Sequence, residues 1–87
     1  MSNYIIVLSK KTEKILENMS DYIAEPIHNA IIALGENPRP TGYKKLKGRN
    51  AYRIRIGDYR IIYEIIDDKL IIKIITIGRR NNIYKNL

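Results

Sequence analysis

The sequence predicts a single two-layer α+β domain in which two helices pack on one face of an antiparallel sheet. Its 87 residues are 45% hydrophobic and 29% charged, which suits one globular core but not two. Apolar residues recur at helical spacing between residues 9 and 35, whereas residues 52–63 alternate between apolar and polar. We therefore expect one domain over residues 1–87, ordered strand, helix, helix and three strands, with a short C-terminal tail or helix.

Residues 4–8 form a short apolar run that predicts a buried first strand. Ser9 should cap the helix that follows, because its hydroxyl can accept from an otherwise unpaired backbone N–H. Ile15, Leu16 and Met19 have helical spacing, so this helix should lie flat on the sheet. The opening run is too short for a signal peptide or a membrane span and no basic segment precedes it, which predicts a cytoplasmic protein.

A second helix is predicted by an apolar stripe of Ile27, Ala30, Ile31 and Leu34. Two starting points are open. The helix either begins near Pro26, where the missing N–H is harmless, or begins at Ser20-Asp21 and bends at the proline. Gly35 should follow its last turn, and the two prolines and the glycine of residues 36–42 predict a loop leading to the sheet.

Residues 52–63 predict a β-hairpin. Gly57-Asp58, with glycine first, has the pattern of a two-residue type II′ turn, because glycine tolerates the positive φ required there. This turn fixes the pairs Ile56 with Tyr59, Arg55 with Arg60, Ile54 with Ile61 and Arg53 with Ile62. Because side chains alternate along a strand, the core face should carry Ile54, Ile56, Tyr59, Ile61 and Tyr63.

The opposite face of the hairpin would carry Arg53, Arg55 and Arg60, which we call the arginine face. Like charges directly opposite each other destabilise a sheet by up to ~1 kcal/mol, so folding alone would not select the pair of Arg55 and Arg60. An anion between them would reverse the sign of this interaction. The face is therefore a candidate phosphate site, and the alternative is a solvated strand surface in a protein rich in lysine and arginine.

A second tight turn centred on Asp67-Asp68 predicts a third strand after the hairpin. That turn would pair Tyr63 with Ile72, Ile61 with Ile74 and Ile62 with Lys73. Lys73 would then extend the arginine face. Glu64 also falls on this face, as a proton acceptor or, as we favour, in a salt bridge to Lys73 or an arginine. Because Gly78 can break the alternation, the pattern does not decide which of Arg79 and Arg80 turns towards the arginine face.

The net charge is +7 and is unevenly distributed. Residues 1–40 carry four lysines and arginines against five carboxylates, whereas residues 41–87 carry twelve against four. Such asymmetry favours a nucleic-acid ligand or an acidic protein partner over a membrane surface, since no helix combines a basic face with a strongly apolar one. The basic segment 43–50, with Leu46 as its aliphatic anchor, is either a phosphate-contacting loop or a solvated one.

The composition gives no reason to expect a metal or another cofactor. The chain has no cysteine and one histidine, which makes a zinc site improbable. That histidine, His28, falls in the second predicted helix, away from the arginine face, so we do not assign it a catalytic role. No paired carboxylates of the glycosidase type are present.

Five segments resemble the RelE/ParE toxin superfamily: Lys45-Leu46-Lys47-Gly48, Tyr52-Arg53-Ile54-Arg55, Gly57-Asp58-Tyr59-Arg60-Ile61-Ile62-Tyr63, Gly78-Arg79-Arg80 and Ile83-Tyr84. The resemblance spans nearly the whole chain and implies the RelE-like fold. RelE members are messenger RNA endonucleases that act in the ribosomal A site and are held inactive by an antitoxin encoded beside them, whereas ParE members poison DNA gyrase. The resemblance therefore implies an antitoxin partner that covers the basic face or displaces the C-terminal tail.

Carried over by position, the RelE catalytic set falls on Arg53, Arg55, Arg60, Arg80 and Tyr84. Some relatives have lysines where this chain has the first two arginines, and an arginine, with a pKa above ~12, cannot act as a general base. We therefore expect these residues to bind phosphate and stabilise charge while the RNA 2′-hydroxyl attacks. The tyrosine offers a ring for base stacking or a hydroxyl for proton transfer.

Further RNA contacts are expected from Lys44, Lys45, Lys47, Arg49, Lys73 and Arg79. Three functions remain open from the sequence. The first is a RelE-like endonuclease, which the full arginine and tyrosine set favours. The second is a ParE-like gyrase inhibitor, and the third is a basic nucleic-acid-binding domain without activity.

Overall fold

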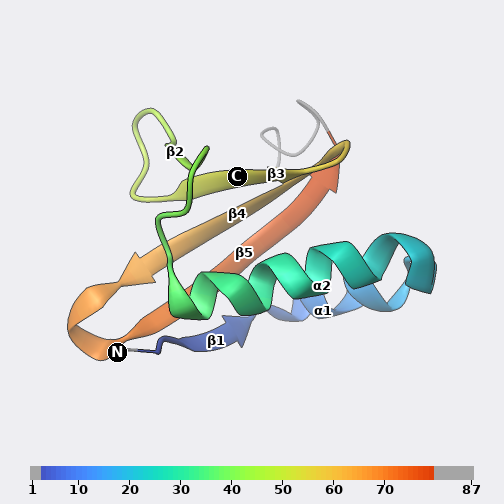
Figure 1. Cartoon of the computed structure of the whole chain (residues 1–87), viewed down its shortest axis with the longest axis horizontal. Helices are drawn as coiled ribbons and strands as arrows, with labels where there is room; N and C mark the ends of the chain where they lie inside the picture. The colour runs from blue at the N-terminus through green and yellow to red at the C-terminus, as the bar shows by residue number, and fades with distance from the viewer. Residues whose placement is uncertain (1–2, 80–87) are drawn as a thin grey trace.

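The computed structural model describes residues 3–79, which form two helices packed against one face of a twisted sheet (Figure 1). Its elements are β1 Ile5–Leu8, α1 Lys10–Glu17, α2 Asp21–Glu36, β2 Lys44–Lys45, β3 Tyr52–Ile56, β4 Tyr59–Ile66, a 3-10 turn Asp67–Lys69, and β5 Ile71–Arg79. The predicted α+β architecture is confirmed. In the part of the chain described, neither helix has the length and apolar character needed to cross a bilayer.

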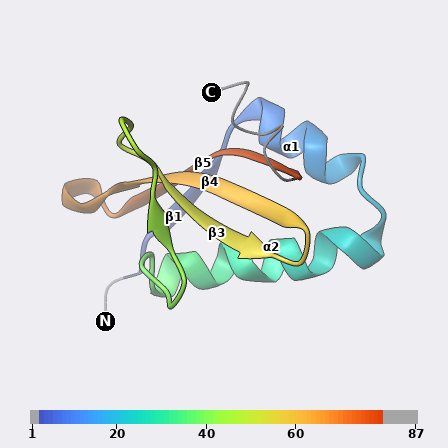
Figure 2. The same cartoon turned by 90° about the horizontal axis from the view of Figure 1, so that it is seen from above.

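The sheet has the strand order β1-β5-β4-β3-β2. It differs from the prediction in two respects. The two-residue strand β2 adds a member, and β1 pairs with β5 in parallel, so the sheet is mixed rather than wholly antiparallel. Seen from above, both helices lie beneath the same face of the sheet, and within residues 3–79 no helix covers the other face, which we call the open face (Figure 2).

The two helices begin where the sequence predicts a cap. The Ser9 hydroxyl accepts a hydrogen bond from the backbone N–H of Thr12 at 3.1 Å, which confirms its capping role. α2 begins at Asp21 and continues through Pro26, so the longer of the two predicted helices is the one formed. Ile27, Ile31 and Leu34 of α2 are buried in the core, as their spacing predicts.

Gly35 lies inside α2 rather than after it, so its predicted role as the residue following the helix is wrong. The helix continues to Glu36 and ends at Asn37, whose backbone is extended. The reason for a glycine at position 35 is close packing. A Cβ there would lie 3.2 Å from the carbonyl oxygen of Tyr4, whose N–H donates to the Gly35 carbonyl at 2.7 Å.

The first strand is not buried as predicted. Ile5 is 65% exposed and Val7 is 42% exposed, whereas Ile6 and Leu8 pack against the core. β1 is an edge strand in the order of the described sheet, and helices cover only one of its faces. Its alternate side chains therefore reach the open face, although the sequence of the strand is apolar throughout.

The hairpin β3–β4 forms in the predicted register, including the direct pair of Arg55 with Arg60. Gly57 has a φ of +59°, and Asp58 is not among the residues with positive φ, as a type II′ turn requires. The predicted core face is confirmed, because its five residues all belong to the main apolar cluster or pack against it: Ile54, Ile56, Tyr59, Ile61 and Tyr63.

The predicted register between β4 and β5 is wrong. We expected the pairs Tyr63 with Ile72, Ile61 with Ile74 and Ile62 with Lys73. The structure pairs Tyr63 with Ile74, Ile61 with Ile77 and Ile62 with Thr76. The connection is longer than a two-residue turn, because the 3-10 turn is followed by Leu70 in the left-handed region at φ 54°. A β-bulge then adds one unpaired residue, Ile75, to β5.

Candidate nucleic-acid interface

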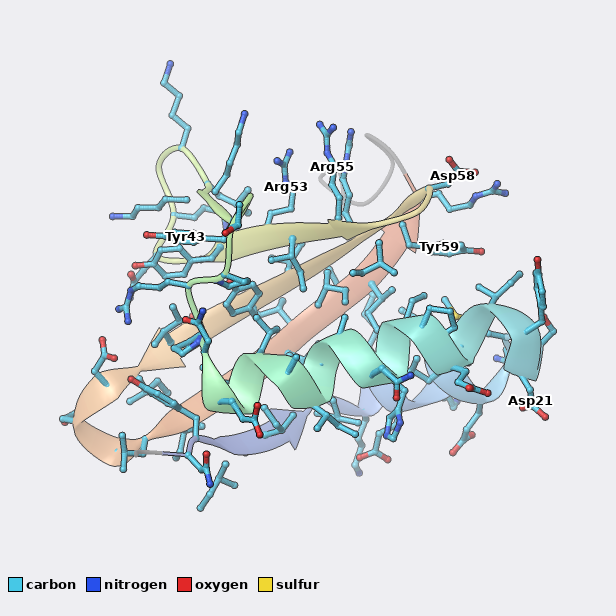
Figure 3. All side chains as sticks on the ribbon, in the orientation of Figure 1. Asp21, Tyr43, Arg53, Arg55, Asp58 and Tyr59 are labelled. Carbon is cyan, nitrogen blue, oxygen red and sulfur yellow. The ribbon has the colours of Figure 1, made fainter. Side chains whose placement is uncertain are left out.

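The arginine face lies on the open side of the sheet. Arg53 and Arg55 project from β3 away from α2 (Figure 3). Arg55 is exposed, and Arg53 and Arg60 are half-buried. On β5 the residue opposite Arg60 is Gly78, which adds no side chain to this face. A shallow pocket of about 210 Å³ is lined by Arg55, Gly57, Asp58, Tyr59 and Arg60. The structure thus brings three of the five predicted catalytic residues together on neighbouring strands.

A small second apolar cluster supports this face. Ile62 and Ala51 are fully buried, and Leu46 and Ile75 pack against them. Leu46 is thus the anchor that the sequence predicts for the loop after β2, and its N–H donates to the Ala51 carbonyl at 2.8 Å. The Nε of Arg53 is buried and makes no hydrogen bond. An unpaired buried donor of this kind costs about 1–3 kcal/mol.

The basic segment 43–50 continues from the arginine face along the edge of the sheet. Lys44 pairs with Arg53, so both side chains belong to the open face, whereas Lys45 pairs with Tyr52 and belongs to the helix side. Lys47 and Arg49 are exposed in the loop that Leu46 anchors. Of these four predicted RNA contacts, the register therefore separates Lys45 from the arginine face.

Lys73 and Arg79 lie farther from the proposed site than expected. Lys73 belongs to the open face but pairs with Glu64 rather than Ile62, so a carboxylate lies opposite it. Arg79 pairs with Tyr59, and its guanidinium lies 5.5 Å from the centre of that ring and 3.6 Å from an Asp58 carboxylate oxygen. Arg79 therefore shares the helix-side face, away from the arginine face. Arg80 and Tyr84 lie outside the described residues.

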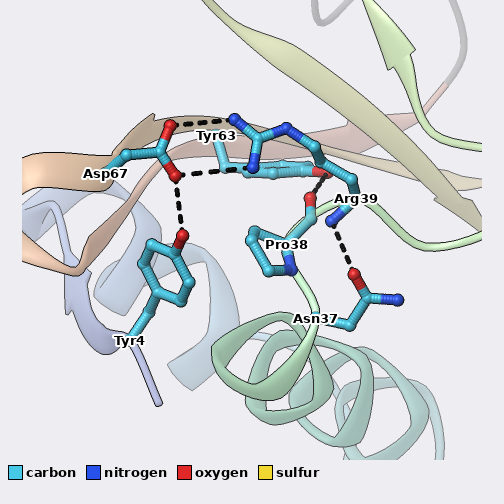
Figure 4. Close-up of polar contacts among 6 residues, drawn as sticks. All are labelled: Tyr4, Asn37, Pro38, Arg39, Tyr63 and Asp67. Carbon is cyan, nitrogen blue, oxygen red and sulfur yellow. Dashed lines mark hydrogen bonds and ion pairs between the residues drawn. The ribbon is translucent and has the colours of Figure 1, made fainter. Parts of the chain in front are cut away.

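A network of hydrogen bonds connects the loop before β2 to the 3-10 turn between β4 and β5 (Figure 4). Arg39 donates to both carboxylate oxygens of Asp67, at 2.9 and 3.4 Å, and the Tyr4 hydroxyl donates to Asp67 at 2.6 Å. The Arg39 and Tyr4 hydrogen bonds hold the pKa of Asp67 below its usual value. The buried Tyr63 hydroxyl donates to the Pro38 carbonyl at 2.7 Å, and burial raises the pKa of Tyr63.

A groove that the sequence analysis missed borders the arginine face. It has a volume of about 660 Å³ and runs between α2 and the outer edge of β3. Its lining is mainly apolar, with Ala30, Ala33, Leu34, Ile54 and Ile56 along it and Lys44, Arg53 and Arg55 at its basic rim. No local sequence pattern predicts such a groove, because the groove arises from the spacing between a helix and a strand that are far apart in the sequence. In residues 3–79 no cluster of acidic or histidine side chains could hold a metal.

Comparison with known proteins assigns the family. Residues 6–84 match the family described as the ParE toxin of the type II toxin-antitoxin system parDE. The chain therefore belongs to the RelE/ParE superfamily of toxins, as its motifs predicted.

Named relatives fall within the RelE branch. The chain is 34% identical over 85 residues to toxin RelE1 of Methanocaldococcus jannaschii, covering 93% of this chain and 94% of the relative. It is 25% identical over 80 residues to the mRNA interferase toxin RelE of Escherichia coli K12, and this match covers 88% of this chain and 83% of the relative. The archaeal RelE-RelB complex of Pyrococcus horikoshii OT3 contains a chain that superposes with a TM-score of 0.80 at 27% identity, covering 91% of this chain and 97% of that one.

Proposed function

We propose that this toxin is an endoribonuclease that cleaves messenger RNA in the ribosomal A site. Its catalytic residues are Arg53, Arg55 and Arg60 of the open face, together with Arg80 and Tyr84, which stay predictions from the sequence. Lys44, Lys47 and Arg49 contact the RNA backbone beyond the cleaved bond. Lys45, Lys73 and Arg79 are more distant candidates for such contacts.

The observation that carries this proposal is the direct cross-strand pair of Arg55 and Arg60, with Arg53 beside them, on the sheet face opposite the one that α1 and α2 cover. Guanidinium groups match phosphate geometry and stay charged at every physiological pH. A buried apolar cluster on the same face, with Ala51 and Ile62 at its centre, packs beside the arginines and helps to hold their strands in place, as charge stabilisation requires. The name mRNA interferase of the Escherichia coli relative gives this chemistry a precedent in the superfamily.

The reaction uses the nucleophile that RNA already carries. The 2′-oxygen forms a bond to the adjacent phosphorus, the bond from phosphorus to the 5′-oxygen breaks, and a 2′,3′-cyclic phosphate and a 5′-hydroxyl result. The 2′-hydroxyl loses a proton and the departing 5′-oxygen gains one. Tyr84 is the candidate group for one of these transfers, and water serves the other. The arginines align the backbone and neutralise charge on the non-bridging oxygens.

The absence of a strong base among these residues gives a reason for ribosome dependence. Positioning by the ribosome would supply the alignment that the enzyme alone does not provide. We also propose an antitoxin partner, because the Pyrococcus horikoshii relative was solved as a RelE-RelB complex. Free in the cytoplasm, such a toxin requires continuous neutralisation.

The test compares Arg55→Ala with Lys10→Ala, which removes one exposed positive charge at the start of α1. We expect Arg55→Ala to lower the rate of cleavage of ribosome-bound messenger RNA by about 100-fold or more, and Lys10→Ala to leave it unchanged. Primer extension maps the cut, and thermal unfolding verifies that both variants fold. Full cleavage by a folded Arg55→Ala protein would refute the assignment, and equal wild-type rates on free and ribosomal RNA would refute ribosome dependence.

Gyrase inhibition is the second candidate, because the matching family description is that of ParE toxins. Such a toxin would bind a protein target and need no cluster of phosphate-binding arginines. A supercoiling assay with purified gyrase separates the two functions. Inhibition of gyrase that persists in Arg55→Ala, without transcript cleavage by the wild type, would establish the ParE-like function.

A further inference from the structure

The two outer edges of the described sheet differ in how they are protected. A free strand edge presents unpaired N–H and C=O groups, and proteins usually guard it with lysines, prolines or a very short strand. β2 at one edge has only two residues, Lys44 and Lys45, and both are exposed. β1 at the other edge has four residues, Ile5–Leu8, with no charge and no proline among them. The edge of β1 is therefore the unguarded one.

The main chain of Ile6 faces this outer edge. The Ile5 N–H donates to the Leu70 carbonyl at 2.7 Å, on the side of β5, so the next residue directs its N–H and C=O away from β5. The Tyr4 N–H is taken up by the Gly35 carbonyl of α2 at 2.7 Å. No strand or helix in the described part of the chain pairs with Ile6 on this side. Its peptide groups are thus available to a further strand.

The surface around this edge is apolar. Ile5 is 65% exposed, Val7 is 42% exposed and Leu70 is 39% exposed. Ile71, which lies directly opposite Ile5 on β5, is half-buried on the same open face. Contiguous exposed apolar side chains of this kind mark contacts with another protein surface. An unpaired strand edge and an apolar patch therefore coincide on β1.

We propose that two copies of this chain associate through β1, whose strands pair antiparallel around Ile6 and join the two sheets into one. In this register Ile6 of each copy exchanges both main-chain hydrogen bonds with Ile6 of the other. Ile5 then lies opposite Val7 of the second copy, and both belong to the open face. Each copy thereby covers the exposed apolar side chains of the other.

Charge selects a second copy over other occupants. The chain carries a net charge of +7, so two copies repel each other except where the local charge is balanced. β1 has no charged residue, and Lys73, the open-face lysine of β5, lies opposite Glu64. The basic strands β2 and β3 are at the other side of the sheet (Figure 1). No cation of β1 is available to bind an acidic peptide, a nucleic acid or an anionic membrane.

The proposed interface is isologous, because the same residues of each copy meet. Its two-fold axis is perpendicular to the joined sheet, so both open faces lie on the same side, with the two arginine faces towards its outer ends. The inference goes beyond the proposed nuclease and does not depend on it, because no arginine takes part in the contact.

Sedimentation velocity of the toxin between about 1 and 200 µM measures the association, since a contact through one short strand is small and its Kd should be micromolar. Ile5→Lys and Ile32→Lys form a matched pair, because each places a positive charge at an exposed isoleucine, and only the first lies on β1. Ile5→Lys should raise the dimer Kd by about 10-fold or more, and Ile32→Lys by less than about 2-fold. Val7→Lys repeats the test, and thermal unfolding verifies that each variant folds.

Disulfide formation tests the register, because the chain has no cysteine of its own. A mixture of the Ile5→Cys and Val7→Cys proteins should form a cross-linked dimer, since the two Cα atoms lie about 4.5 Å apart in a non-hydrogen-bonded antiparallel pair. Either variant alone should cross-link about 10-fold more slowly, because its two cysteines are offset along the strands by about 7–8 Å.

A toxin that stays monomeric up to about 200 µM would overturn the proposal and leave the edge to a protein of different sequence. Equal effects of Ile5→Lys and Ile32→Lys would also overturn it. Faster cross-linking of either cysteine variant alone than of the mixture would contradict the register around Ile6. Dissociation of the dimer when NaCl is raised from about 0.15 to about 0.5 M would identify a charged contact elsewhere, because salt does not weaken apolar association.

Discussion

Replacing Tyr63 with phenylalanine tests the attachment of the loop before β2. The Tyr63 side chain is fully buried, and its hydroxyl makes the 2.7 Å hydrogen bond to the carbonyl of Pro38, itself a buried residue. The variant keeps the ring but leaves this carbonyl without its donor, a loss of about 1–3 kcal/mol. For a domain of this size each kcal/mol lowers Tm by roughly 4–8 °C. We expect a decrease in Tm of roughly 5–20 °C.

Urea denaturation followed by circular dichroism measures this loss, and Tyr22→Phe provides the control. Tyr22 is 90% exposed, so removing its hydroxyl should change the free energy of unfolding by less than about 0.5 kcal/mol. If Tyr63→Phe were as stable as Tyr22→Phe, the hydrogen bond to Pro38 would contribute nothing and our account of how the loop is attached would be refuted.

The stability difference between the wild type and Tyr63→Phe should depend on pH in the alkaline range. Burial raises the pKa of Tyr63 above its ordinary value of 10.0, so the unfolded chain releases this proton at lower pH than the folded protein does. The contribution of Tyr63 to stability is therefore complete below pH 10 and is lost as the pH rises above it. The stability advantage of the wild type over Tyr63→Phe should shrink above pH 10, and an advantage independent of pH would contradict the burial argument.

Three further predictions concern the network, the turn and the RNA contacts. Because the pKa of Asp67 is lowered from 3.8, the stability advantage of the wild type over Asp67→Asn should be present above that pH and disappear in acid unfolding below it; Asp68→Asn, which leaves the Arg39 contact intact, should show no such change. Gly57→Ala places a side chain at φ +59° and should cost about 1 kcal/mol in urea unfolding, more than Gly57→Asn. Lys47→Ala should weaken RNA binding in a filter assay and reduce the salt dependence by about one phosphate contact, and an unchanged slope would place it outside the interface.

The hairpin could be predicted from the sequence because its determinants are local. Gly57 fixes the turn, the turn fixes the register, and the alternation of side chains then assigns Arg53, Arg55 and Arg60 to one face. The same reasoning fails between β4 and β5. Leu70 adopts a left-handed conformation without being glycine or asparagine, so no residue type signals the longer connection.

The bulge at Ile75 has the largest consequence for the site. Without it, strict alternation from Ile74 would direct Arg79 to the open face. The extra residue reverses the faces of residues 76–79, so Arg79 pairs with Tyr59 on the helix side and Gly78 comes to lie opposite Arg60. Packing across the whole sheet decides where a bulge falls, and a strand in which five of nine residues are isoleucine carries no local signal for it.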